Sequence, residues 1–151
     1  MPNHRPTAPP KAPADTTANA TFPPDAVPDA FLAQCPSRTV LTRLVEKWTL
    51  LILVALADGP RRFGALRRQI EGVSQKMLTQ SLRRLERDGL VDRRLYDEMP
   101  LRVEYSLTAL GRDALPLVAQ LKRWAEAHLH TIEARREAFD RALAPPDDPR
   151  S

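Results

Sequence analysis

The sequence predicts a mainly α-helical fold that carries one small β-hairpin, which places it in the α+β class. Apolar residues recur at helical spacing in four segments between residues 36 and 90, and again after residue 108. Between these helical patterns, residues 91–107 hold two short runs of alternating apolar and polar residues, which indicate two strands. A length of 151 residues suggests that these elements form one domain.

Composition sets the limits of the folded part. Eight of the fifteen prolines lie in the first 28 residues, among Ala, Thr, Asn and Asp. A segment of this composition buries too little apolar surface to order itself. We therefore expect a disordered arm over residues 1–30, a folded domain over residues 31–143 and a disordered tail over residues 144–151.

The folded part begins with two helical patterns. Pro36 and Ser37 suit the start of a helix. The stretch from Trp48 to Leu56 is apolar on nearly all sides, so it predicts a buried helix. An Asp-Gly-Pro turn at residues 58–60 ends this pattern.

The next segments form a helix, a tight turn, a second helix and a hairpin. Residues 61–63 suit a short extended piece and residues 63–70 a short helix, and Ser74 is placed to cap the helix that follows it. The strands of the hairpin are expected over residues 91–95 and 103–107, joined by the polar sequence DEMP. Thr108 is placed to cap a long C-terminal helix. This order of elements predicts a winged helix-turn-helix, in which the hairpin is the wing.

The helix that follows Ser74 has an unusual polar face, with amides, hydroxyls and cations but almost no carboxylates. Gln75, Thr79 and Arg83 fall on one line along it, with Lys76 and Gln80 beside them. In a helix-turn-helix this helix lies in the DNA major groove, where such side chains read base edges and hold phosphates. The predicted DNA contacts on this helix are therefore Ser74, Gln75, Lys76, Thr79, Gln80 and Arg83. The alternative is an ordinary polar helix face.

Arg102, at the start of the second predicted strand, is a further candidate contact. An arginine on a wing can enter a narrow minor groove or bind a phosphate. The alternative is a salt bridge on the hairpin, for instance with Asp92 or Glu104.

The positive charge of the chain is confined to one segment. Residues 60–103 hold eleven Lys and Arg against six Asp and Glu, which gives this segment a net charge of +5, whereas the whole chain carries +4. A localised basic excess suits a polyanion such as double-stranded DNA, although a solvated positive face is the alternative. A winged helix that binds another protein instead of DNA would lack this basic recognition helix.

Other functions find little support in the sequence. It has no phosphate-binding glycine loop, no metal-ligand spacing and no Ser/His/Asp set, so we expect neither an enzyme nor a cofactor nor a metal site. The single cysteine excludes an internal disulfide, and a cytoplasmic location is the default. No apolar run is long enough for a membrane span.

Several motifs resemble the HxlR family of bacterial transcription regulators. They are Lys47-Trp48-Thr49, the stretches 59–66 and 70–91, and the V-E-Y-x-L-T-x-x-G motif at 103–111, and the likeness covers about ninety residues. The resemblance implies a homodimer, with the terminal helices packing across the two-fold axis, that regulates nearby genes, with repression the expected mode. One departure is that Val45 and Glu46 replace the family's usual glycines, so the first two helices are expected to be straighter or one continuous helix.

Cys35 lies just before the first predicted helix, near Arg38. Exposed N–H groups and a nearby cation should lower the pKa of its thiol. Some members of the HxlR family use a cysteine here to sense oxidants, quinones or aldehydes, so Cys35 is a redox-sensing candidate. The alternative is an inert, half-buried residue. Trp48 and Trp124 could line a pocket for a small-molecule effector, but their spacing favours plain core packing.

Overall fold

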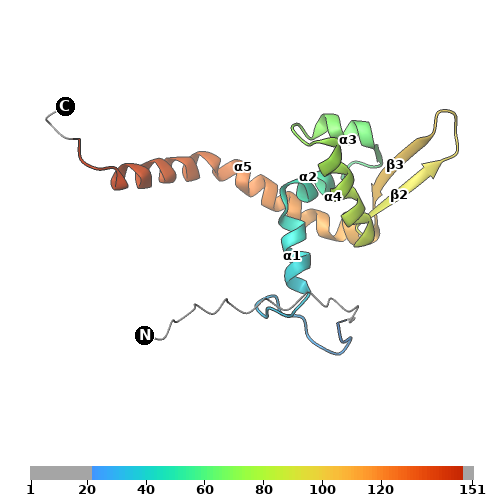
Figure 1. Cartoon of the computed structure of the whole chain (residues 1–151), viewed down its shortest axis with the longest axis horizontal. Helices are drawn as coiled ribbons and strands as arrows, with labels where there is room; N and C mark the ends of the chain where they lie inside the picture. Colours follow the sequence, from blue (N-terminus) through green and yellow to red (C-terminus); the bar gives the residue numbers. More distant parts are fainter. Residues whose placement is uncertain (1–21, 148–151) are drawn as a thin grey trace, which may run out of the picture. The chain divides into compact units, whose positions relative to one another are not determined.

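The computed structural model of the protein describes residues 22–147, and the chain divides between Arg38 and Thr39 into two units. Residues 22–38 form turns and the start of the first helix. The unit from Thr39 onward holds every strand and most of the helical residues, as the colours of Figure 1 show. Most of the expected arm (residues 1–21) and half of the expected tail (residues 148–151) lie outside the described residues.

The first two helices are separate, contrary to the expectation of one continuous helix. Helix α1 spans Ser37–Val45 and α2 spans Lys47–Ala55. Glu46 between them has φ −61° and ψ 135°, an extended conformation that no α-helix contains. The predicted helix start at Ser37 is confirmed, and α2 supplies the centre of the core with the fully buried Ile52 and Leu53.

Helices α3 (Phe63–Gln69) and α4 (Gln75–Arg87) form the predicted helix-turn-helix. The Ser74 hydroxyl oxygen accepts a hydrogen bond from the Met77 N–H at 3.1 Å, which confirms Ser74 as the cap of α4. Leu78, Leu82 and Leu85 are at most 1 % exposed, and they hold α4 to the core. The opposite face of α4 is thereby fixed toward solvent.

The wing is part of a three-stranded antiparallel sheet with the order β1-β3-β2. Strands β2 (Val91–Tyr96) and β3 (Arg102–Leu107) confirm the predicted hairpin. The third strand, β1 (Arg61–Arg62), is the short extended piece expected before α3, and it adds to the free edge of β3. The wing extends beyond the helices of its unit (Figure 1).

A close backbone contact joins the sheet to α5 (Ala109–Leu143). The Thr108 N–H donates to the Leu90 carbonyl oxygen at 3.1 Å, and the Thr108 hydroxyl caps α5 by accepting from the Gly111 N–H at 3.0 Å. A Cβ atom on Gly111 would lie 2.1 Å from the Leu90 carbonyl oxygen. Only glycine therefore lets the first turn of α5 approach the start of β2 this closely.

The C-terminal half of α5 continues past the rest of its unit (Figure 1). Helix α5 packs against α2, and Val118 is buried there, but the residues beyond it are mostly exposed. Trp124 is 56 % exposed and stacks on His128, so the expectation of plain core packing is wrong for this tryptophan. Trp48 does pack against the core.

We predict that Gly111→Ala destabilises the protein by about 1–3 kcal/mol, because the added methyl group must displace the Leu90 backbone. The measurement is the free energy of unfolding by urea. Gly64→Ala is the matched control: its Cβ would meet only the flexible end of Arg68 at 3.3 Å. Within α3 this change should be neutral or stabilise by about 0.5–1 kcal/mol. Equal stability of the Gly111→Ala and wild-type proteins would show that the contact is not a constraint.

Candidate nucleic-acid interface

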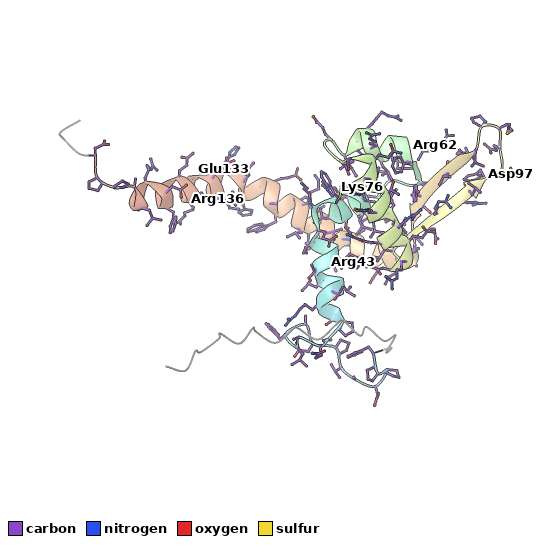
Figure 2. The ribbon with its side chains drawn as sticks, viewed as in Figure 1. Arg43, Arg62, Lys76, Asp97, Glu133 and Arg136 are labelled. Carbon is purple, nitrogen blue, oxygen red and sulfur yellow. The ribbon has the colours of Figure 1, made fainter. Side chains whose placement is uncertain are left out.

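The predicted DNA-contacting residues of α4 lie on its exposed side. Gln75, Lys76, Gln80 and Arg83 are exposed, and Thr79 is half-buried. Figure 2 shows Lys76 on α4, and Asp97 at the loop that joins β2 to β3. The Thr79 hydroxyl donates to the Gln75 carbonyl oxygen at 2.8 Å. The hydroxyl oxygen of Thr79 is therefore still able to accept a hydrogen bond.

The two flanks of α4 differ in how their charges are paired. On one flank Arg84 lies 3.6 Å from the Glu46 carboxylate, and Asp88 lies 2.7 Å from the Arg43 guanidinium. On the predicted contact face, Lys76 and Arg83 have no ion pair or hydrogen bond within residues 22–147. Lys76 and Arg83 could therefore bind a polyanion without breaking an ion pair.

Arg102 is the predicted contact that the structure places differently from the others. Its guanidinium lies 3.2 Å from the Glu98 carboxylate and 3.7 Å from that of Glu104, and 4.0 Å from the centre of the Tyr96 ring. The alternative of a salt bridge on the hairpin, with Glu104, is thus present. DNA contact by Arg102 remains a prediction, and it would require exchange of these partners for phosphate.

Strand alternation separates the arginines of the wing. Arg94 is paired in register with Glu104 and stacks on Tyr96, so it lies on the same sheet face as Arg102. Arg93 is paired with Tyr105 on the other face, together with the buried Val91 and Leu107. Arg93, and not the predicted contact Arg102, is the wing arginine on the side of α4. Arg93 lies two residues after the buried Val91 on the same strand, and this spacing alone indicates that the two side chains share a sheet face.

Cys35 is buried, with 7 % of its surface exposed, and belongs to the unit that ends at Arg38. The pKa of its thiol is lowered chiefly by hydrogen bonds from the Ser37 hydroxyl, at 3.0 Å, and the Ser37 N–H. The Asp29 N–H, at 3.3 Å, also lowers the pKa, whereas burial and the Asp29 carboxylate oppose the shift. The predicted direction is confirmed, but its cause is not Arg38, whose guanidinium donates to the carbonyl oxygens of Ala30 and Phe31.

The part of the chain that the structure describes holds neither a metal-ligand cluster nor a membrane-spanning helix. No group of three or more His, Cys, Asp and Glu side chains there could hold a metal ion. None of the helices found there is long and apolar enough to cross a membrane.

A capped helix with a polar, cationic exposed face, set behind a short helix and beside an antiparallel wing, defines a winged helix-turn-helix DNA-binding protein. The HxlR-like helix-turn-helix family matches residues 43–133, and the chain belongs to this family. It is a transcriptional regulator of the helix-turn-helix type and not an enzyme.

Known relatives cover most of the folded part. The chain is 50 % identical over 107 residues to the HTH-type transcriptional regulator YtfH of Escherichia coli, a match that covers 71 % of this chain and 85 % of YtfH. The structure of a putative transcriptional regulator, YtfH from Salmonella typhimurium, is similar with a TM-score of 0.70 and 50 % identity, covering 74 % of this chain and 99 % of that one. The oxidised form of the redox regulator HypR is similar with a TM-score of 0.58 and 42 % identity, covering 62 % and 96 %.

Proposed function

We propose that the protein is a sequence-specific repressor that acts in the cytoplasm as a homodimer on a pseudo-palindromic DNA operator. The observation that carries this proposal is the exposed face of α4, where amides and unpaired cations stand on a helix fixed by three buried leucines. These groups match the acceptors and donors that base pairs present in the major groove. Repression follows where the operator overlaps a promoter, because the bound protein excludes the polymerase.

Apolar surface on α1 and α5 supports the homodimer. In the unit from Thr39 onward, Val40, Leu117 and Trp124 are each more than half exposed. Together α1 and α5 border a hollow of about 390 Å³ that is lined largely by apolar side chains, with the Arg43–Asp88 ion pair at its edge. A second copy would cover this surface through a two-fold axis, because a self-complementary patch closes in a symmetric dimer.

The family resemblance and the symmetry of such a dimer together specify the DNA site. Two copies of α4 related by a two-fold axis read two half-sites in inverted orientation. Half-sites of helix-turn-helix dimers lie about 34 Å apart, one turn of the duplex. The operator should therefore be an inverted repeat read from one side of the DNA.

We predict that selection of bound duplexes from a random pool enriches an inverted repeat of this spacing. Gln80→Ala should then relax the base preference at one position per half-site, by about 1–3 kcal/mol if the amide makes a bidentate contact. Thr42→Ala, on α1, is a control outside the contact face. The measurement is the binding constant for the selected duplex and for its single-base variants. Absence of binding to any duplex at low salt would favour the alternative, a module that binds another protein.

We predict that Trp124→Glu weakens the dimer, because it places a carboxylate within an apolar interface. Sedimentation equilibrium should show a larger dissociation constant, and DNA binding should weaken with it. Arg123→Glu is the matched control, since it adds the same carboxylate one residue away on α5, about 100° around the helix. An unchanged dimer in the Trp124→Glu protein would remove this part of α5 from the interface.

We further propose that Cys35 makes the regulator responsive to oxidants or electrophiles. The proposal is supported by the lowered pKa of the thiol and by the likeness to a protein described as a redox regulator. With one cysteine per chain, oxidation by diamide must join Cys35 to a small thiol or to the same cysteine of the second copy. Either disulfide replaces the thiolate that accepts the Ser37 hydrogen bond at the first residue of α1 with a weaker, neutral acceptor, and this would alter the helix that borders the proposed dimer surface.

We predict that the rate of Cys35 alkylation by iodoacetamide, followed against pH, has its midpoint below that of the unfolded chain. A lowered pKa means that the Cys35 thiolate persists to lower pH in the folded protein. The stability that the thiolate contributes is therefore fully present above the pKa of Cys35 in the unfolded chain, and it is lost as the pH falls through the pKa of Cys35 in the folded protein. Ser37→Ala should raise the midpoint by removing the largest cause of the shift.

In the same experiment, diamide should release DNA from the wild-type protein but not from Cys35→Ser. An unshifted midpoint together with diamide-resistant DNA binding would leave Cys35 a structural residue. A Cys35→Ser protein that still released DNA would have the same consequence.

A further inference from the structure

A polar notch lies between α4 and the wing. It has a volume of about 330 Å³ and is lined by three residues of α4 (Thr79, Arg83 and Glu86), by Arg93 of β2 and by Tyr105 of β3. The lining thus holds two guanidinium groups, two hydroxyls and one carboxylate. Nothing in the fold requires this combination, because the buried leucines of α4 already hold the helix to the core.

The register of the sheet brings the wing side of the notch together. Arg93 and Tyr105 are directly opposite each other on β2 and β3, so their side chains emerge on the same face. On the other side of Tyr105, β1 places Arg61 opposite it, and the Arg61 Nε is buried without a hydrogen-bond partner among the described residues. Two arginines therefore flank Tyr105 across the sheet.

Among the described residues, the Thr79 hydroxyl of the notch donates to the Gln75 carbonyl oxygen, but three other polar groups of the lining have no partner. Arg83, Arg93 and the Tyr105 hydroxyl make no hydrogen bond, ion pair or ring contact within residues 22–147. Glu86 is the one acidic lining residue, so the two arginines leave the notch with a net positive charge. Arg94 and Arg102, on the opposite sheet face, are instead held by Tyr96 and by carboxylates. The notch therefore brings together Arg93, an unpaired cation of the wing, and Arg83, an unpaired cation of α4.

The geometry of B-form DNA supplies an anion for this place. The sugar–phosphate backbone is the ridge that separates the major groove from the neighbouring minor groove. If α4 lies in the major groove and the wing lies over the adjacent minor groove, that ridge must cross the space between them. The notch occupies this space.

We propose that the notch holds one backbone phosphate of this strand in each half-site. Arg83 and Arg93 bind its oxygens from opposite sides, and the Tyr105 hydroxyl donates a hydrogen bond to it. Arg83 thus fixes the position of α4 on the duplex, and base recognition is left to the residues nearer the start of the helix. The inference rests on the proposed DNA binding and assigns one phosphate contact within it.

The first test measures the salt dependence of binding to a random-sequence duplex. Each phosphate neutralised on B-form DNA contributes about 0.9 to the slope of log K against log salt concentration. Arg93→Ala should lower the slope by about this amount per notch. Arg94→Ala is the matched control, because it removes the same charge from the next residue of β2 on the opposite sheet face. Tyr105→Phe should weaken binding but keep the slope, since a neutral donor releases no counterion.

The second test uses the duplex selected in the random-pool experiment, with single phosphates replaced by neutral methylphosphonates. The wild-type protein should lose affinity at one phosphate per half-site, on the strand between the major-groove segment and the adjacent minor groove. The Arg93→Ala protein should lose sensitivity at that phosphate alone, and Arg94→Ala should retain it. Unfolding curves of each variant show whether the fold is kept.

The outcomes separate this inference from the proposed function. If the wild-type protein binds no DNA, the proposed function fails. If it binds DNA, and Arg93→Ala leaves the slope and the methylphosphonate pattern unchanged, the notch is not a phosphate site although the regulator stands. Equal losses for Arg93→Ala and Arg94→Ala would also overturn the inference, because they would mean that the wing acts as a diffuse positive surface.

Discussion

The recognition surface depends on one close backbone contact, where the first turn of α5 meets the start of β2. The Leu90 carbonyl oxygen accepts from the Thr108 N–H, and Gly111 leaves no side chain in the way. The same threonine hydroxyl donates to the Gly89 carbonyl oxygen at the end of the α4 segment. This contact therefore ties together α4, the wing and α5.

Around this junction, whether a cation is paired with a carboxylate differs from one face of α4 and of the wing to the other. On one flank of α4, Arg84 is paired with Glu46, and on the sheet face that carries Arg94, Arg102 is paired with Glu98. Exposed ion pairs of this kind add little stability. Their carboxylates do, however, neutralise cations that would otherwise attract DNA phosphates to these other faces. Within residues 22–147, Lys76 and Arg83 on the exposed face of α4 and Arg93 in the notch have no ion pair, so they can bind DNA without breaking one.

Sequence periodicity was enough to predict the elements that carry this surface. The helical spacing of Leu78, Leu82 and Leu85 predicts the polar face of α4. Ser74 and Thr108 act as caps because each hydroxyl oxygen accepts a hydrogen bond from the N–H three residues further on. The break at Glu46 was missed, since it requires only a backbone torsion that glutamate can adopt and no glycine marks it. The choice of Arg102 over Arg93 could not be made from charge, because the pairing partners come from register across the hairpin. Helical spacing predicts a core position for Trp124. Spacing cannot separate such a position from one on a surface that a second copy of the chain could cover, because both have the same period.

In the proposed complex, α4 enters the major groove while the wing lies over the adjacent minor groove. Footprinting of the complex with the selected duplex tests it most directly, with dimethyl sulfate probing guanine N7 in the major groove and hydroxyl radicals probing the minor-groove edge of the backbone. We expect two windows of N7 protection about one helical turn apart, each bordered by a segment protected from hydroxyl radicals. Protection from hydroxyl radicals without any N7 protection would contradict it, because the protein would then hold DNA without placing α4 in the major groove.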